Sequence, residues 1–117
     1  MPLLQLFTSA HPADEHKRAH LLKSLSALVA RLLGKPEGYV MISLTARAEM
    51  SFAGSSAPAC YAELKNVGTL SPGQVETLSR FLCQELSSGL GVPAERIYIE
   101  FTNADGAMWG WNGGTFG

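Results

Sequence analysis

The sequence predicts an α+β fold: a tandem βαβ duplication forming one four-stranded mixed sheet, with two helices on one face and short strands in the C-terminal tail. The first observation is an internal repeat, because Leu33-Gly34-x-Pro36 recurs as Leu90-Gly91-x-Pro93, a shift of 57 residues from Gly34 to Gly91. The second is that apolar residues at helical spacing precede each copy, and alternating apolar residues follow it. The third is length, since 117 residues suit a single domain, residues 1–117, with a real core.

The first unit begins with a short apolar strand, residues 1–8. After a turn at residues 9–12, Asp14 and Glu15 supply the negative charge that favours a helix start. Gly34 and Pro36 end this helix. Its apolar face is Leu21, Leu22, Leu25, Leu28, Val29, Leu32 and Leu33. Residues 39–45 then alternate in character, which predicts a strand with one buried face.

The second unit follows a loop over residues 46–58, with a short irregular strand expected around residues 50–52. Residues 60–67 return to strand character. The run Ser71-Pro-Gly-Gln74 predicts a helix start with a capping box, and Gly89 or Gly91 ends that helix. The last long strand alternates around Ile97, Ile99 and Phe101, and the glycine-rich tail 103–117 carries both tryptophans.

Two helices on one face leave the other face of the sheet without cover. We expect parts of Leu4, Leu6, Met41 and Tyr61 to be exposed there, while the tail gives Trp109 and Trp111 no obvious place to bury. Contiguous apolar surface of this kind marks an interface. The sequence therefore predicts a closed homo-oligomer, with the tail as a subunit contact or an added strand.

Composition excludes several classes of partner. The net charge of −1 gives no reason to expect nucleic acid or an acidic membrane surface. No apolar run reaches the roughly 18 residues that span a bilayer, and no secretory leader opens the chain. The two cysteines, Cys60 and Cys83, lack metal or redox spacing. A cytoplasmic protein with free thiols is the simplest interpretation.

Several chemistry-bearing residues also have plain structural interpretations. His16 and His20 stand four apart on a helix, but no third ligand accompanies them, so we expect no metal and no cofactor. Taken alone, Lys35 is an exposed lysine at a helix end and Tyr98 a packing residue of a strand. The two tryptophans can be interface anchors alone.

The Met1-Pro2 start has a chemical consequence if Met1 is removed. The ring nitrogen of Pro2 then becomes a free secondary amine. This is the one arrangement in which a proline nitrogen accepts a proton, because an acylated proline nitrogen is an amide. Methionine is commonly removed when the next residue is small, and proline qualifies.

Five motifs stand in order along the chain: Pro2, Gly34-Lys35-Pro36 with Tyr39-Val40, Phe52-x-Gly54-Ser55-Ser56-x-Pro58, Arg96-Ile97-Tyr98-Ile99, and Gly110-Trp111-Asn112-x-x-Thr115-Phe116. Together they resemble the macrophage migration inhibitory factor family of the tautomerase superfamily. The resemblance runs the full length of the chain. It implies a duplicated βαβ fold that assembles as a homotrimer.

The resemblance also implies a phenylpyruvate-type keto–enol tautomerase, an intramolecular oxidoreductase that acts on aromatic α-keto acids. Pro2 matches the catalytic base and Lys35 the residue that binds the substrate carboxylate. Val67 matches a residue whose backbone bonds substrate, and Tyr98 a pocket tyrosine from across a subunit boundary. The residues that match the apolar rim are Trp109, Trp111 and Phe116.

Physical chemistry is consistent with these implied roles. A free α-amino group has a pKa of roughly 7.7–8.0. Burial among aromatic rings and the nearby ammonium of Lys35 both lower that pKa. A base with a pKa near or below neutrality suits proton transfer. Tyr98 can donate a hydrogen bond to the developing enolate oxygen.

Two residues depart from the family pattern. Glu100 stands where mammalian members carry asparagine, and its carboxylate can repel an anionic substrate, raise the pKa of Pro2, or pair with Lys35. The second departure is at Ala59-Cys60-Tyr61-Ala62, which lacks the Cys-x-x-Cys of some members, so no thiol oxidoreductase activity is expected.

Two other functions remain open. The first is a cytokine-like signalling protein that binds a receptor, because mammalian relatives signal and are exported without a signal peptide. The second is a trimeric binding scaffold with vestigial chemistry, which the unusual Glu100 keeps open.

Overall fold

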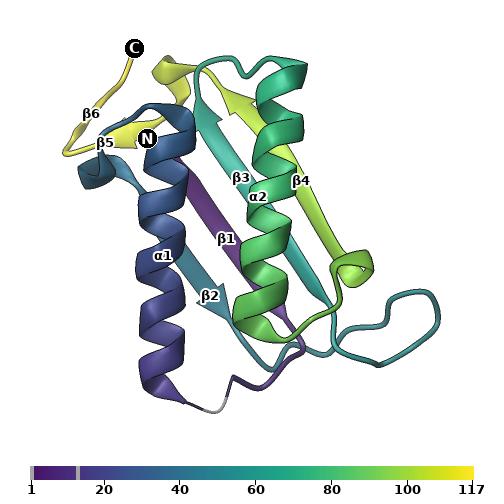
Figure 1. The fold of residues 1–117 in the computed structure, drawn as a ribbon. Coiled ribbons are helices and arrows are strands. Elements are labelled where there is room, and N and C mark those ends of the chain that lie inside the picture. The colour runs from purple at the N-terminus through teal and green to yellow at the C-terminus, as the bar shows by residue number, and fades with distance from the viewer. Residues whose placement is uncertain (1, 13) are drawn as a thin grey trace.

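A computed structural model describes residues 2–12 and 14–117. Its main sheet has the strand order β2-β1-β3-β4, and a second sheet pairs β5 with β6 (Figure 1). In chain order the elements are β1 (Leu3–Thr8), α1 (Glu15–Leu33), the 3₁₀ helix η1 (Glu37–Tyr39), β2 (Met41–Thr45), β3 (Cys60–Val67), α2 (Pro72–Leu90), η2 (Ala94–Arg96), β4 (Ile97–Ala104), η3 (Gly106–Met108), β5 (Gly110–Trp111) and β6 (Gly114–Thr115). Met1, the first residue of the predicted strand, lies outside the described residues.

The repeat appears in the elements themselves. Helices α1 and α2 are both 19 residues long, and α2 begins 57 residues after α1, at Pro72 instead of Glu15. Each helix ends at a left-handed glycine, Gly34 with φ 64° and Gly91 with φ 69°. Strands β1 and β2 pair in parallel, as do β3 and β4, while β1 and β3 pair antiparallel. The predicted duplication and mixed sheet are therefore confirmed.

The starts of the two helices are capped as the sequence predicts. The Asp14 carboxylate accepts a hydrogen bond from the backbone N–H of His16 at 2.9 Å. Ser71 and Gln74 form the reciprocal capping box of α2. Of the two candidate stops for α2, Gly91 is the cap. Gly89 lies inside the helix, where an added Cβ would stand 2.5 Å from a methyl group of Leu21, so it lets α1 approach closely.

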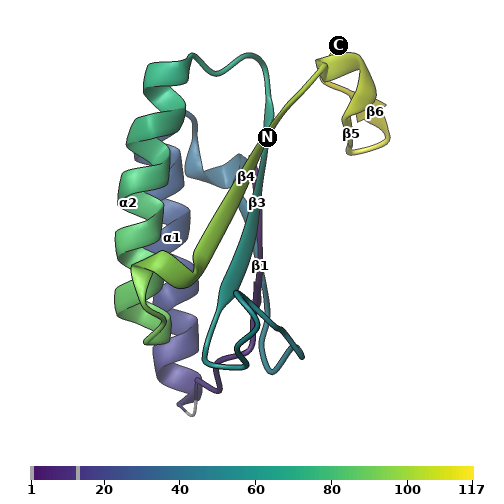
Figure 2. The same cartoon turned by 90° about the vertical axis from the view of Figure 1, so that its right-hand side faces the viewer.

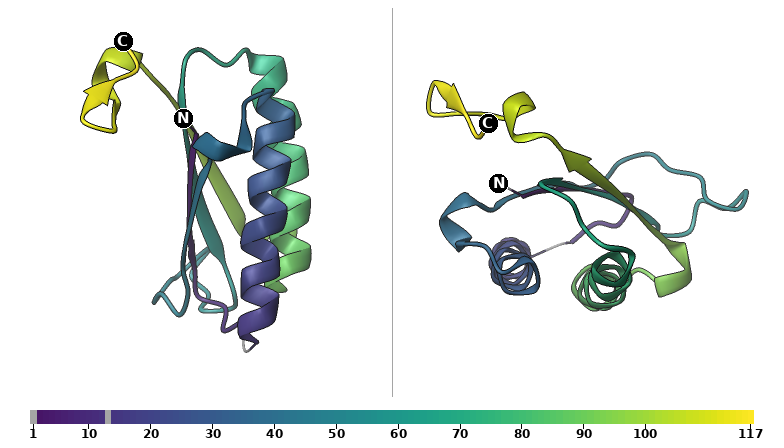
Figure 3. Two further views of the ribbon diagram at one scale, coloured as in Figure 1. Left: turned by 90° about the vertical axis from the view of Figure 1, so that its left-hand side faces the viewer. Right: turned by 90° about the horizontal axis from the view of Figure 1, so that it is seen from above.

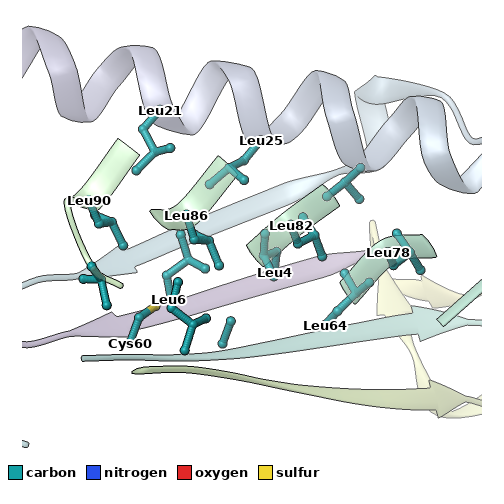
Figure 4. Packing of buried hydrophobic residues seen from close by; sticks show 14 of the residues in the cluster. Leu4, Leu6, Leu21, Leu25, Cys60, Leu64, Leu78, Leu82, Leu86 and Leu90 are labelled. Atoms are coloured by element: carbon teal, nitrogen blue, oxygen red, sulfur yellow. The ribbon is translucent and has the colours of Figure 1, made fainter. Parts of the chain in front are cut away.

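The core lies between the sheet and the two helices. Leu4 and Leu6 are fully buried there, against Leu25, Leu82 and their neighbours (Figure 4). The expectation that Leu4 and Leu6 face outward was therefore wrong. Strand β1 is apolar at successive positions, and its alternation places these two leucines on the helix side.

Neither α1 nor α2 covers the opposite face of the sheet (Figures 2 and 3). One cross-strand row on it holds Phe7, Tyr61 and Tyr98, and Tyr98 is 65% exposed. Met41, at the other end of this face, is 64% exposed. The β5–β6 hairpin stands out from the sheet on the side away from the helices. The predicted uncovered face exists, although its apolar residues are partly different.

Two short elements differ from expectation. Tyr39 belongs to η1 instead of a strand, because its N–H bonds the carbonyl of Pro36 at 3.1 Å. The irregular strand expected at residues 50–52 is a single bridge between Phe52 and Ser55. Ala53 and Gly54 both have positive φ, as a two-residue hairpin turn requires.

Among residues 2–12 and 14–117, no helix has the length and apolar character needed to cross a membrane.

Candidate functional site

A cavity of about 290 Å³ opens at the start of β1. Pro2 and Leu3 line one side, residues 38–41 a second, and residues 109–111 with Phe116 a third. Pro2 is fully buried, and its carbonyl accepts a hydrogen bond from the N–H of Met41 at 3.0 Å. Three segments far apart in the sequence therefore meet around the residue that the Met-Pro start singled out.

Aromatic rings form one wall of this cavity. The ring of Tyr39 meets Trp111 edge-on, with centroids 5.4 Å apart, and meets Phe116 at 5.9 Å. Trp111 and Phe116 stack at 5.7 Å. Because Trp111 remains 53% exposed, the wall is open to solvent on one side. The structure thus brings all three predicted rim residues, including Trp109, to the cavity of Pro2.

The position of this wall depends on how the tail folds back on itself. The N–H of Phe116 donates to the carbonyls of Gly106 and Trp109, at 3.1 and 3.2 Å. A Cβ added at Gly106 would stand 2.7 Å from the carbonyl oxygen of Phe116, so only glycine fits there. The glycine-rich composition of the tail therefore serves to place an aromatic surface beside Pro2.

Lys35 follows the glycine cap of α1 and reaches across to the end of β3. Its ammonium donates to the side-chain oxygen of Asn66 at 2.6 Å and to the carbonyl of Val67 at 2.7 Å. Burial lowers the pKa of Lys35 from its usual value of 10.5. Leu3 pairs with Lys65, so one further step along this antiparallel register puts Pro2 opposite Asn66. Lys35 and Val67 therefore lie next to the Pro2 end of β1.

Tyr98 and Glu100 lie away from the cavity of Pro2 in the same chain. Tyr98 pairs with Tyr61, six residues before Val67, which is about 20 Å along the sheet. Glu100 accepts a hydrogen bond from the Thr102 hydroxyl of its own strand. Its pairing with Lys35 does not occur within the described chain, since the lysine bonds Asn66 and Val67. A single chain thus holds Pro2, Lys35, Val67 and the rim, and holds Tyr98 and Glu100 apart from them.

Arg96 has a structural role that the sequence did not reveal. Its guanidinium donates to four carbonyl oxygens of the loop, those of Phe52, Ser55, Ala57 and Pro58, at 2.9–3.1 Å. It also lies 5.1 Å from the ring centroid of Phe52. Phe52 in turn packs against Tyr98 at 4.8 Å. Arg96 therefore fixes the loop whose aromatic residue supports Tyr98.

Two further residues near the site were missed. Tyr39 stands in one of the five motifs, but the alternation of residues 39–45 predicts only a strand position for it. Asn66 is 2% exposed and occupies a position that the alternation of β3 otherwise gives to Cys60, Ala62 and Leu64. The sequence signal for Asn66 is that it is a polar residue at the end of a series of apolar positions on one face of the strand.

Metal and thiol chemistry find no support in the part of the chain that the structure describes. His16 and His20 line a groove between the start of α1 and the end of α2, but no group of three His, Cys, Asp or Glu side chains gathers there or elsewhere in residues 2–12 and 14–117. Cys60 and Cys83 are free thiols. Burial, with a smaller effect of Cys83, raises the pKa of Cys60 to about 11, which keeps it protonated.

Comparison with known proteins places these features in a family. The family profile described as "Macrophage migration inhibitory factor (MIF)" matches residues 1–117. A macrophage migration inhibitory factor homolog of Trichinella spiralis is 37% identical over 116 residues, covering 99% of this chain and all of the relative. The crystal structure of a homologue from Prochlorococcus marinus has a TM-score of 0.91 at 43% identity, covering 98% of this chain and 99% of the other. Leishmania major MIF2 has a TM-score of 0.89 at 34% identity, covering 99% and 97%.

Proposed function

Since this chain belongs to the macrophage migration inhibitory factor family, within the tautomerase superfamily, we propose that it is a keto–enol tautomerase of phenylpyruvate-like α-keto acids, with Pro2 as general base. The observation that carries this proposal is the cavity that Pro2 and an aromatic wall line together. The Lys35 ammonium is not part of that lining but bonds Val67 at the same end of the sheet. The aromatic wall suits an aryl ring, and the ammonium suits a carboxylate.

The reaction needs one base that moves one proton. After Met1 is removed, the neutral amine of Pro2 takes a proton from the carbon next to the substrate carbonyl, which leaves an enolate. The resulting ammonium of Pro2 then returns the proton to the carbonyl oxygen, so that the enol forms and the base is regenerated. Atoms and charges balance without a cofactor. Burial of Pro2 favours the neutral amine that starts this cycle.

The neighbouring cation supports the same protonation state. A positive charge near an amine disfavours protonation of that amine, so the Lys35 ammonium would favour the neutral form of Pro2. The same charge attracts the substrate carboxylate. Val67 presents its carbonyl toward Lys35, and we propose that its backbone hydrogen-bonds the substrate.

The remaining site residues require a second subunit. Tyr98 lies on the uncovered face, about 20 Å from the Pro2 end of its own chain. We therefore propose a homotrimer in which each cavity receives Tyr98, and with it Glu100, from a neighbour. Both residues point to the same face of β4, because they stand two apart. In that setting Glu100 adds negative charge near an anionic substrate and slows turnover relative to a neutral residue.

The direct test measures enol–keto interconversion of phenylpyruvate and hydroxyphenylpyruvate. We expect a folded Pro2→Gly variant to lose about 10²-fold or more in kcat/KM, the usual contribution of a general base. If that variant keeps the wild-type rate while folded, Pro2 is not the base. A wild-type protein with a processed N-terminus and no turnover of any keto acid would instead support a binding scaffold.

Receptor binding is the second candidate function. The description shared by the relatives refers to an effect on macrophage migration. An exposed aromatic and methionine surface, with Met108 82% exposed and Trp111 53% exposed, is available in one chain for a protein partner. A receptor-binding assay would test this candidate, and failure to bind at high protein concentration would count against it.

A further inference from the structure

The ammonium of Lys35 is held by neutral acceptors. Its two partners are an amide oxygen and a backbone carbonyl, Asn66 Oδ1 at 2.6 Å and Val67 O at 2.7 Å. Neither carries a formal charge. A carboxylate at either place would have held the lysine equally well but would have cancelled its charge. The geometry therefore fixes the direction of the lysine while leaving its positive charge for another anion.

Asn66 is well placed for this task because it cannot easily move. It is 2% exposed, on the side of β3 that packs under the helices. A buried polar side chain is costly unless it is hydrogen-bonded, and the lysine supplies that bond. The register puts Asn66 opposite Pro2, so the lysine that it holds stands beside the proposed base.

We propose that Asn66 is a positioning residue, which aims the Lys35 ammonium at the substrate carboxylate without neutralising it. The inference rests on the proposed function and deepens it. An amide suits this position better than a carboxylate. An aspartate of nearly the same shape would retain the contact with Lys35 but would cancel the positive charge that binds the anion. If the bond between Lys35 and Asn66 served only to tie the end of α1 to β3, Asn66→Asp would leave substrate binding unchanged. An ion pair would hold the two elements at least as well.

The test compares Asn66→Asp, which adds a negative charge, with Asn66→Ser, which adds none. We expect Asn66→Asp to raise KM for phenylpyruvate by about tenfold or more, because a charge-assisted contact to the substrate is lost. The KM for the uncharged methyl ester of phenylpyruvate should change by less than about threefold, and kcat should change less than KM. Asn66→Ser also loses the positioning contact but adds no charge, so it should raise KM for phenylpyruvate less than Asn66→Asp does.

A second measurement does not depend on turnover. Binding of 3-phenylpropionate, a non-reacting aryl carboxylate, is measured by calorimetry for wild type, Asn66→Asp and Lys35→Ala. We expect both variants to weaken binding, and we expect Asn66→Asp to add nothing in a Lys35→Ala background. Equal binding and equal KM in wild type and folded Asn66→Asp would overturn the inference. Asn66-dependent binding without turnover in wild type would leave it standing and overturn the proposed function instead.

Discussion

At the scale of single residues, the site depends on two amines with opposite requirements. Pro2 must be neutral to accept a proton, whereas Lys35 must be charged to hold a carboxylate. Burial disfavours the charged form of both, and it lowers the pKa of Lys35 below 10.5. Asn66 and Val67 favour the charged lysine by accepting hydrogen bonds from its ammonium. In the proposed mechanism, the same environment favours a neutral Pro2 and a charged Lys35.

This arrangement predicts how substrate affinity depends on pH. Because the pKa of Lys35 is lowered, the ammonium is lost as pH rises through a value below 10.5, and affinity for the carboxylate falls with it. We expect KM for phenylpyruvate to rise on the alkaline side before an ordinary lysine would titrate. Steady-state kinetics across pH 7–10.5 check this. Lys35→Arg keeps its charge throughout that range, so its KM should stay flat; a parallel rise in both proteins would contradict the prediction.

The sequence allowed some of these residues to be predicted and not others. Pro2, Lys35, Val67 and the tail aromatics came from motif matches. The structure places Pro2 and the tail aromatics around one cavity and bonds Lys35 to Val67. The partner of Lys35 could not be predicted in this way. The residue of β3 that faces the lysine is decided by how the segment after α1 packs against the end of β3. Lys35 and Asn66 are 31 positions apart in the sequence.

At the scale of elements, the loop between β2 and β3 is the least regular part of the chain and projects beyond the end of the sheet (Figure 1). It contains the four residues whose carbonyls Arg96 bonds, and a turn at Ala53 with φ 53°. A positive φ is unfavourable for alanine. One guanidinium with a planar fork of donors offsets that cost by bonding four carbonyls.

Replacing this guanidinium should loosen the loop before it affects the core. We expect Arg96→Ala to speed amide hydrogen exchange and proteolysis within residues 52–58, and to leave exchange in α1 and α2 unchanged. Arg96→Lys should fall between wild type and Arg96→Ala, because one ammonium cannot serve four carbonyls. Arg80→Ala, which removes a surface arginine lying over Phe81, is the matched control. Unchanged exchange in the loop of Arg96→Ala would show that the four bonds do not hold it.

Most elements could be predicted because the duplication determines their positions twice. Both helices, both glycine caps and both parallel strand pairs follow from one repeated pattern. The faces of β1 could not be assigned in this way. Apolar residues stand at both odd and even positions of β1, Leu3, Leu4, Leu6 and Phe7, so its sequence shows no clear alternation although its burial does alternate. Only the packing against the helices shows that Leu4 and Leu6 point inward.

At the scale of the whole molecule, the sheet face without helices is the main feature that one chain leaves incomplete. Its aromatic row contains Phe7 and Tyr61, stacked at 6.3 Å, and continues to the exposed Tyr98. We expect a Phe7→Glu substitution to introduce a charge that prevents association over this face. Because Tyr98 would then reach no neighbouring cavity, kcat/KM should fall together with the particle mass.

Light scattering and kinetics on the same samples check this expectation. Gln84→Glu, which adds the same charge on the exposed side of α2, is the control and should remain assembled and active. A Phe7→Glu protein that keeps the wild-type mass would show that this face is not the contact. A monomer with full activity would show that Tyr98 of a neighbour is not needed.

The central claim concerns one nitrogen atom, that of Pro2. The most direct test is the initial rate of phenylpyruvate enol–keto interconversion for two forms of the chain, identified by intact mass: one that begins at Pro2 and one in which a residue still precedes Pro2. The account predicts turnover for the first form. For the second it predicts a rate that is lower by at least about 10²-fold, because an acylated proline nitrogen accepts no proton. Equal rates for the two forms would contradict it.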